Sequence, residues 1–399
     1  MSSDTTLKRT LNYPLLTFYG LGSIVGAGIY VLIGEVAGQA GTSMGFSFLL
    51  AGVVAGLAGA GYAELSSRFP QSAGAALYVD IAFNQPWFSR VVAALLVFTG
   101  IVSSATICQG FVGYLQLYVD LGDLMIISGL CIIMFAIASW GIKESAVLIA
   151  VITTLEVAGL VIVMVVAGDL EPRASLVDVV DVSAGVGAIA AGAFLAFYAF
   201  IGFEDMVNVA EEVKEPEKNM PRGILSAVIL STLLYIAMAV VAVVYIDLLA
   251  LSESKSPLAL MVGHNDIAMN VIGIISMMAI VNGALVQIIM SARVMYGMAV
   301  RGHLPAVFAL LNARTQTPVI NTLITTGLIW LLAAMLPLVT LAAITSTLML
   351  FIFIIVNIGL LRIKRMPEHA AHTGFQLPIW IPALSAGCTA LLLVYQLFN

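Results

Sequence analysis

The chain has 399 residues, of which 61% are hydrophobic and only 10% are charged. A soluble domain carries about 25% charged residues. A water-soluble globular protein is therefore excluded, because so few polar side chains could not cover its surface. The solvent for most of this surface must be lipid. The net charge of −6 says little by itself, because its distribution across the membrane matters more than its sum.

Long apolar runs predict an all-α polytopic membrane protein. A helix needs about 20 apolar residues to cross the bilayer core. Strands of a membrane β-barrel would be shorter and would alternate in polarity. We predict eleven spans, at 15–38, 43–66, 91–118, 124–141, 145–168, 186–210, 223–249, 268–292, 319–335, 338–361 and 375–397. The transmembrane core is then 15–361, after a polar segment 1–14, and 375–397 is an additional helix.

The basic residues predict the orientation of these spans. With the N-terminus in the cytoplasm, all of the 16 Lys and Arg residues except Arg173 and Lys255 fall on the cytoplasmic side. We therefore expect a multi-pass protein of the cell (inner or plasma) membrane, with the C-terminus outside. Pro378 and Pro382 leave a half-span that dips and returns as the alternative for the last helix. Glu64, near a span end, can reach water and is expected to have an interfacial or a packing role.

The first span contains four glycines within nine residues, Gly20, Gly22, Gly26 and Gly28. Each costs about 1 kcal/mol relative to Ala in a helix. Close packing of small residues against another helix is one interpretation. The other is an unwound segment that lines a polar cavity, where free N–H groups and a half-helix N-terminus bind a carboxylate.

The sixth span places Gly202, Glu204 and Asp205 deep in an apolar run. Acidic side chains inside a membrane imply a cavity or a polar partner. They could hold a substrate ammonium group or cap the second half of the helix. Spans one and six stand five helices apart. Because five is odd, helices 15–168 and 186–361 would form an inverted repeat, with the two broken helices meeting near the midplane.

Five motifs resemble those of the amino acid–polyamine–organocation superfamily, in the same order. They are GSIVGAGI at 22–29, YAELSSRFP at 62–70, FIGFE at 200–204 with AEEVKEP at 210–216, SARVMYGMA at 291–299, and GHLP at 302–305. The resemblance covers about residues 8–365, and its closest branch is the bacterial relatives of the cationic amino acid transporters. Most members have twelve spans, so a contact made by a twelfth helix, such as a homodimer contact, is left open here.

The resemblance implies a leucine-transporter-like fold, with helices 1 and 6 unwound, and alternating access. It implies that Ile24, Ala27 and Gly28 bind the substrate carboxylate and that Tyr198 and Ile201 receive the α-amino group. Tyr198 or Phe203 would close over the substrate as a gate. The full set of expected substrate-binding residues is Ser23, Ile24, Gly26, Ala27, Gly28, Tyr198, Ile201, Phe203 and Glu204.

Proton-coupled members of the family carry a lysine midway along helix 5, where this chain has Glu156. Near the midplane, lipid disfavours a charged carboxylate, so Glu156 must be protonated, paired or facing water. We therefore predict it to be the coupling site, for H⁺ or alternatively Na⁺. A buried structural glutamate and a ligand for a substrate amine are the other interpretations.

The predicted function is secondary active transport of amino acids, as a proton-coupled symporter, with a polyamine or cationic amine carrier or exchanger as the alternative. An enzyme is not expected, since the four His residues, His264, His303, His369 and His372, all fall in loops and suggest no catalytic or metal cluster. A channel is disfavoured, because no filter-like loop or charged ring is visible. No cofactor, metal or nucleic acid is expected.

Overall fold

The computed structural model describes residues 9–71, 74–140, 146–179, 185–369 and 374–398. Within these residues the secondary structure is helical, apart from one isolated bridge between Leu11 and Val213. Residues 1–8 of the expected cytoplasmic segment lie outside the described ranges. The longer helices are α1 (Tyr13–Val25), α2 (Ala27–Ala40), α3 (Met44–Arg68), α4 (Gly74–Phe83), α5 (Pro86–Leu115), α6 (Asp123–Trp140), α7 (Ala146–Ala167), α9 (Gly185–Tyr198), α10 (Pro216–Tyr245), α13 (Asp266–Val300), α14 (Val319–Met335), α15 (Leu338–Ile363) and α16 (Trp380–Phe398).

Shorter elements lie at the ends of these helices. The 3₁₀ segment η2 (Phe203–Glu212) continues the chain after α9, and η1 (Gly41–Ser43) joins α2 to α3. The remaining short elements are α8 (Leu176–Val179), α11 (Leu248–Glu253), α12 (Pro257–Met261), η3 (Ala306–Ala309) and η4 (Pro367–His369).

Nine helical stretches of the described chain are long and apolar enough to cross a membrane. One of them, 27–68, contains both α2 and α3. The 17-residue α14 and the 13-residue α1 are shorter apolar helices. If α2 is joined to α1 as one broken helix, and α3 and α14 are each counted, the bundle has the eleven apolar segments that the sequence predicts.

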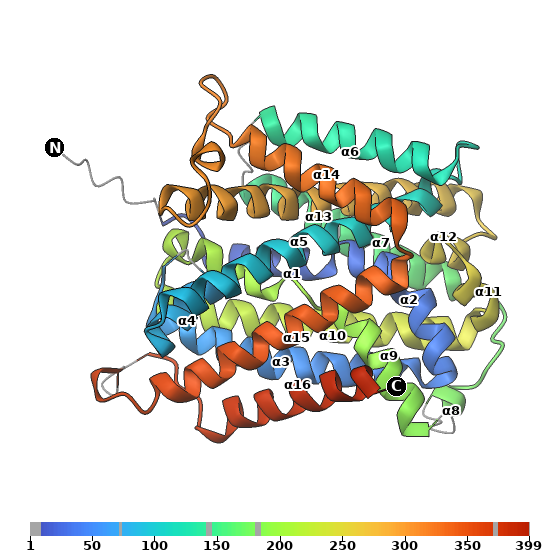
Figure 1. Ribbon diagram of the computed structural model, residues 1–399. Coiled ribbons are helices and arrows are strands. Elements are labelled where there is room, and N and C mark those ends of the chain that lie inside the picture. The colour runs from blue at the N-terminus through green and yellow to red at the C-terminus, as the bar shows by residue number, and fades with distance from the viewer. Residues whose placement is uncertain (1–8, 72–73, 141–145, 180–184, 370–373, 399) are drawn as a thin grey trace.

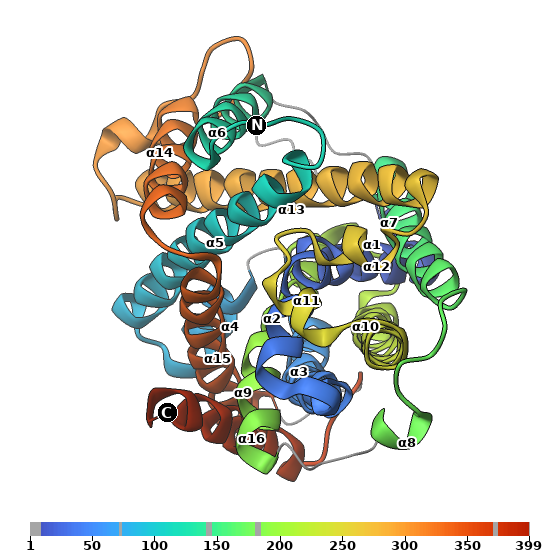
Figure 2. The same ribbon diagram turned by 90° about the vertical axis from the view of Figure 1, so that its right-hand side faces the viewer.

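The helices form two halves with matching contacts. The first half consists of α1–α2, α3, α5, α6 and α7, and the second of α9–η2, α10, α13, α14 and α15. Helix α1 packs on α10 just as α9 packs on α3, and α7 packs on α1 just as α15 packs on α9. The pairs α3–α10, α5–α13 and α6–α14 join equivalent helices of the two halves. The contacts therefore stay the same when the two halves are exchanged, as they do in a structural repeat. Figures 1 and 2 show α5, α6, α13 and α14 together on one side of the bundle.

The outer face of the bundle is apolar. Ile132 on α6, Val165 on α7 and Leu233 on α10 are exposed by 68%, 64% and 60%. Exposed apolar surface of this kind would be unstable in water and is suited to lipid. The all-α polytopic fold predicted from composition is therefore confirmed.

The last segment, α16, is one continuous helix of 19 residues that packs on α15, α3 and α9. The half-span alternative, in which this segment dips and returns, is therefore wrong for the described residues. In Figure 1, α16 runs from left to right along the lower edge of the bundle.

Of the two roles expected for Glu64, the structure shows packing and not contact with water. Its side chain is fully buried, and its Oε1 accepts hydrogen bonds from Arg68 and, at 2.6 Å, from Lys364 Nζ. Its Oε2 accepts from the backbone N–H of Leu377 at 2.9 Å. This cluster joins the end of α3 to the end of α15 and to the segment that leads into α16, so neighbouring helices close over Glu64 before it can extend to the interface.

Candidate functional site

The first broken helix is interrupted at Gly26. Its φ and ψ of −33° and −143° are not helical, and they separate α1 from α2. The Gly26 N–H still donates to the Gly22 carbonyl at 3.2 Å. Helix α2 starts at Ala27 with no side-chain cap. The first N–H groups of a helix have no partner within it and carry partial positive charge. The break therefore produces a candidate anion-binding end inside the protein.

The second broken helix is interrupted after Tyr198, where α9 ends. The N–H groups of Ala199, Phe200 and Ile201 each donate to the carbonyl three residues earlier, so the chain tightens into turns. Gly202 then adopts φ 131°, a conformation that favours glycine. A Cβ on Gly202 would overlap the backbone of Ser23. The two breaks therefore touch each other.

Tyr235 on α10 joins the two breaks by hydrogen bonds. Its hydroxyl lies 2.9 Å from the carbonyl oxygen of Ile24 and 2.9 Å from that of Ala199. Both carbonyls lie at the points where helical hydrogen bonding stops. Because lipid cannot satisfy such groups, a side-chain donor must do so.

A cavity of about 70 Å³ lies between the two breaks. Seven of the residues predicted from the sequence line it: Ser23, Ile24, Gly26, Ala27, Gly28, Tyr198 and Ile201. Side chains from α5 and α13 complete the wall, including Ser103, Asn282 and Gln287, and Asp205 lies at its edge. The structure thus brings together residues of the two breaks that are at least 170 positions apart in the sequence.

Two predicted residues lie elsewhere. Phe203 lines neither this cavity nor the larger one beside it, and its ring packs against Tyr62 and Phe353 at centroid distances of 5.8 and 5.0 Å. It is therefore not placed to close over a substrate in this conformation. Glu204 lines only the larger cavity, and its Oε2 accepts a hydrogen bond from the Gly202 N–H at 2.9 Å. That contact is the capping arrangement considered from the sequence.

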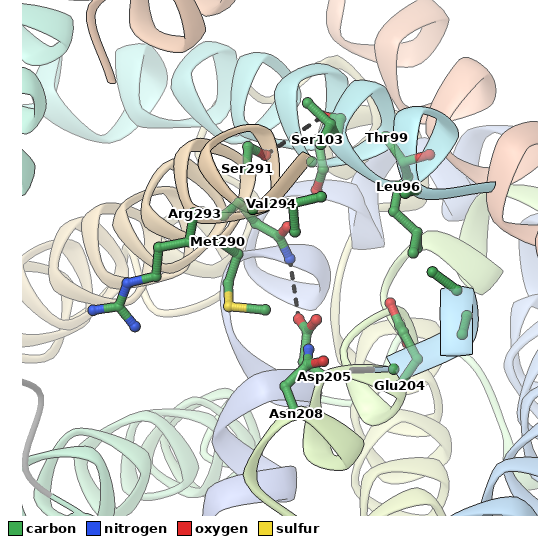
Figure 3. A pocket seen from close by; sticks show the side chains of 18 of the residues that line it. Leu96, Thr99, Ser103, Glu204, Asp205, Asn208, Met290, Ser291, Arg293 and Val294 are labelled. Carbon is green, nitrogen blue, oxygen red and sulfur yellow. Dashed lines mark hydrogen bonds between the residues drawn. The ribbon is translucent and has the colours of Figure 1, made fainter. Parts of the chain in front are cut away.

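The larger cavity, of about 420 Å³, adjoins the first one. Figure 3 shows its lining, with Thr99 and Ser103 on α5 and Met290 and Arg293 on α13. Glu204 and Asp205 lie below them in that view. It extends to Arg293 and Arg301, on the side that the basic residues assign to the cytoplasm.

Glu156 lines neither cavity. It lies on α7, with its side chain almost fully buried, and its two carboxyl oxygens have no hydrogen-bond partner. The Tyr30 hydroxyl donates to its backbone carbonyl at 2.6 Å. One turn earlier on α7, Thr153 packs so closely on Gly22 that a Cβ there would overlap its hydroxyl. Glu156 thus lies beside the first broken helix.

Sequence reasoning missed the contributions of α5, α10 and α13. Ser103, Tyr235, Asn282 and Gln287 are polar residues scattered in long, mainly apolar helices. A polar residue at membrane depth is itself a signal of function. However, none of the four belongs to a motif, so only the fold shows that they face the breaks.

Comparison with known proteins identifies the family. A model of the amino acid permease family matches residues 11–399. The chain belongs to the amino acid permease family. The predicted superfamily is thereby confirmed, and the relatives found are transporters rather than enzymes.

Three relatives illustrate the range of the family. The chain is 30% identical to cationic amino acid transporter 3, mitochondrial, of Arabidopsis thaliana, over 90% of this chain and 63% of that protein. It is 29% identical to the methylthioribose transporter of Bacillus subtilis (97% and 88%) and 26% identical to the branched-chain amino acid permease BcaP of the same organism (92% and 83%). The chain spans about three-fifths of the length of the plant relatives it matches.

Proposed function

We propose that this chain is a secondary active carrier of amino acids that works by alternating access. The observation that carries the proposal is the cavity between the two helix breaks, which residues of both breaks line. A zwitterion needs donors for its carboxylate and acceptors for its ammonium group, and the two breaks supply both. Family membership supports the same function.

The substrate carboxylate would bind at the start of α2, at Gly26, Ala27 and Gly28, where uncapped N–H groups adjoin the cavity. The α-amino group would bind near Tyr198 and Ile201, at the end of α9, where the helix gives way to tighter turns and its negative end adjoins the cavity. The roles follow from the polarity of the two helix ends, which is positive at the start of a helix and negative at its end.

Glu156 is proposed as the proton-coupling residue. A buried carboxylate without a hydrogen-bond partner is strongly disfavoured, so the carboxyl group would be protonated in this conformation. Release of the proton would require an opposite charge or water to reach it. Because Thr153 and Tyr30 connect this part of α7 to the first broken helix, such a change would alter the packing of α1 and α2.

A carrier or exchanger for polyamines or cationic amines is the second candidate. The adjacent acids Glu204 and Asp205 at the two cavities favour it, since they could balance additional positive charge. The names of the relatives called cationic amino acid transporters agree with both candidates, because they combine an amino acid with a positive charge. A cytoplasmic N-terminus, an outside C-terminus, an inner or plasma membrane location and a homodimer belong to the same proposal.

Transport by the purified protein in liposomes tests the function. A carrier should show saturable uptake of labelled amino acids and counterflow, in which an excess of internal unlabelled substrate accelerates uptake. Amines without a carboxylate, such as putrescine, should fail to compete if the first candidate is right. Uptake that rises linearly with concentration and shows no counterflow would contradict a carrier of either kind.

A further inference from the structure

Four residues separate the small cavity from the large one. Ser103, Ile201, Asp205 and Gln287 line both cavities, so they form a partition between about 70 Å³ and about 420 Å³ of space. The small cavity is much the smaller of the two, so a long substrate side chain would have to extend past the partition into the larger one.

Two hydrogen bonds close the partition. Asp205 accepts one from the side-chain amide of Gln287 at 3.2 Å, as the dashed line in Figure 3 shows. The hydroxyls of Ser103 and Tyr198 are 3.0 Å apart. The first bond joins the second broken helix to α13, and the second joins it to α5. Both hydrogen bonds thus come from neutral donors, and in one of them the Gln287 amide binds the Asp205 carboxylate.

The two acids at the partition, Glu204 and Asp205, have no paired cation among the described residues. None of the ion pairs in the described part of the chain includes Asp205 or Glu204. Arg293 lines the larger cavity, but its guanidinium extends away from Asp205 in Figure 3. Glu204 accepts from the backbone of Gly202 and does not reach the small cavity. Asp205 is therefore the acid that a ligand in the small cavity would meet.

From this geometry we infer that Asp205 selects substrates with a positively charged side chain, and that their binding opens the partition. A substrate ammonium or guanidinium competes with the Gln287 amide for the Asp205 carboxylate. A hydrogen bond between two charged groups is about twice as strong as one between neutral groups. The cation therefore displaces Gln287, and it favours the open state because it binds that state better. An apolar side chain offers no donor and leaves the bond intact. The inference rests on the proposed carrier function.

The selectivity test compares lysine and leucine transport by the protein in liposomes. For wild type we expect a higher kcat/KM for lysine than for leucine, and D205N should lower the lysine-to-leucine ratio at least tenfold. E204Q should keep the ratio within about threefold of wild type, even where its overall rate falls. An unchanged ratio in D205N, or an equal loss in E204Q, would overturn the role of Asp205.

The gating test measures access to the partition. A cysteine placed by V286C, which lines the small cavity only, in a background with Cys108, Cys131 and Cys388 replaced by Ala, would report access of a charged methanethiosulfonate reagent from the larger cavity past the partition. Lysine should accelerate the modification severalfold and leucine should not, whereas Q287L should give the fast rate without substrate. Equal rates with and without lysine would overturn the gating step, and this measurement does not depend on D205N folding.

The results separate this inference from the proposed function. If no amino acid shows counterflow with wild type, the carrier function fails. If leucine is transported and D205N leaves the selectivity unchanged, the carrier function stands and the inference about Asp205 fails.

Discussion

A Cβ atom on Gly28 would lie 2.6 Å from the Cα atom of Ala199. The start of α2 and the end of α9 thus meet backbone to backbone, with no space between them for a side chain. We expect G28V to abolish transport, by at least 100-fold, because valine must separate the two breaks that form the cavity. The measurement is counterflow in liposomes with equal amounts of protein, after size-exclusion chromatography shows that the variant is monodisperse.

Gly129 on α6 provides the matched control. A Cβ there would meet nothing within 4 Å. G129A should transport as wild type does, because alanine adds a methyl group in open space and favours the helix. Normal transport by G28V would show that the small cavity is not the substrate site.

The hydroxyl of Tyr235 is the second point at which the two breaks are joined. Y235F would leave the carbonyl oxygens of Ile24 and Ala199 without this donor, while keeping the ring and its packing against Phe200. Leaving a buried polar group unsatisfied costs about 1–3 kcal/mol. We expect transport to fall about tenfold or more. Tyr118, whose hydroxyl bonds to Asn270 in an exposed position, serves as the control, and Y118F should stay within twofold of wild type. An equal effect of both changes would argue against a special role for Tyr235.

The buried ion cluster at the end of α3 should matter for stability. E64Q removes the negative charge that lies 2.6 Å from Lys364 Nζ, in a site with almost no solvent access. Losing one partner of a buried ion pair typically costs about 3–5 kcal/mol. We expect the melting temperature of the purified protein to drop by several degrees.

The exposed pair Glu215–Lys218, at 2.9 Å, is the natural comparison, since both side chains are more than two-thirds exposed. E215Q should leave the melting temperature close to that of wild type, because water screens an exposed pair. If the melting temperatures of E64Q and E215Q are equal, the buried cluster contributes no more than a surface pair.

Glu156 is expected to couple transport to the proton gradient. E156Q keeps the shape of the side chain but can neither take up nor release a proton. It should retain substrate exchange at a rate within about threefold of wild type and should lose accumulation driven by a pH gradient. Uptake is to be measured with and without an imposed gradient in the same liposomes. Gradient-driven accumulation equal to that of wild type would make Glu156 a structural residue.

The C-terminus should lie outside the cytoplasm, because eleven crossings from a cytoplasmic start end on the far side. Alkaline phosphatase fused after Asn399 should be active, and a fluorescent protein fused there should be dark. The opposite pair of results would require an even number of crossings.

The sequence by itself determined the membrane environment, the helical class and the position of the two breaks. These properties follow from composition, from the length of each apolar run and from glycines such as Gly26 and Gly202, all of which are local. Seven of the predicted site residues line the cavity for the same reason, since they lie within the breaks themselves.

Only the tertiary structure decided which side chains complete the site. Phe203 packs against Tyr62 and Phe353, because the turn at Gly202 directs its ring away from the cavity. Asp205 meets Gln287, 82 residues further along the chain, through the packing of η2 near α13. Such contacts depend on how helices cross, and no periodicity within one helix specifies its partner. The chemistry of the breaks is therefore local, whereas the partition that would select the substrate is a product of the fold.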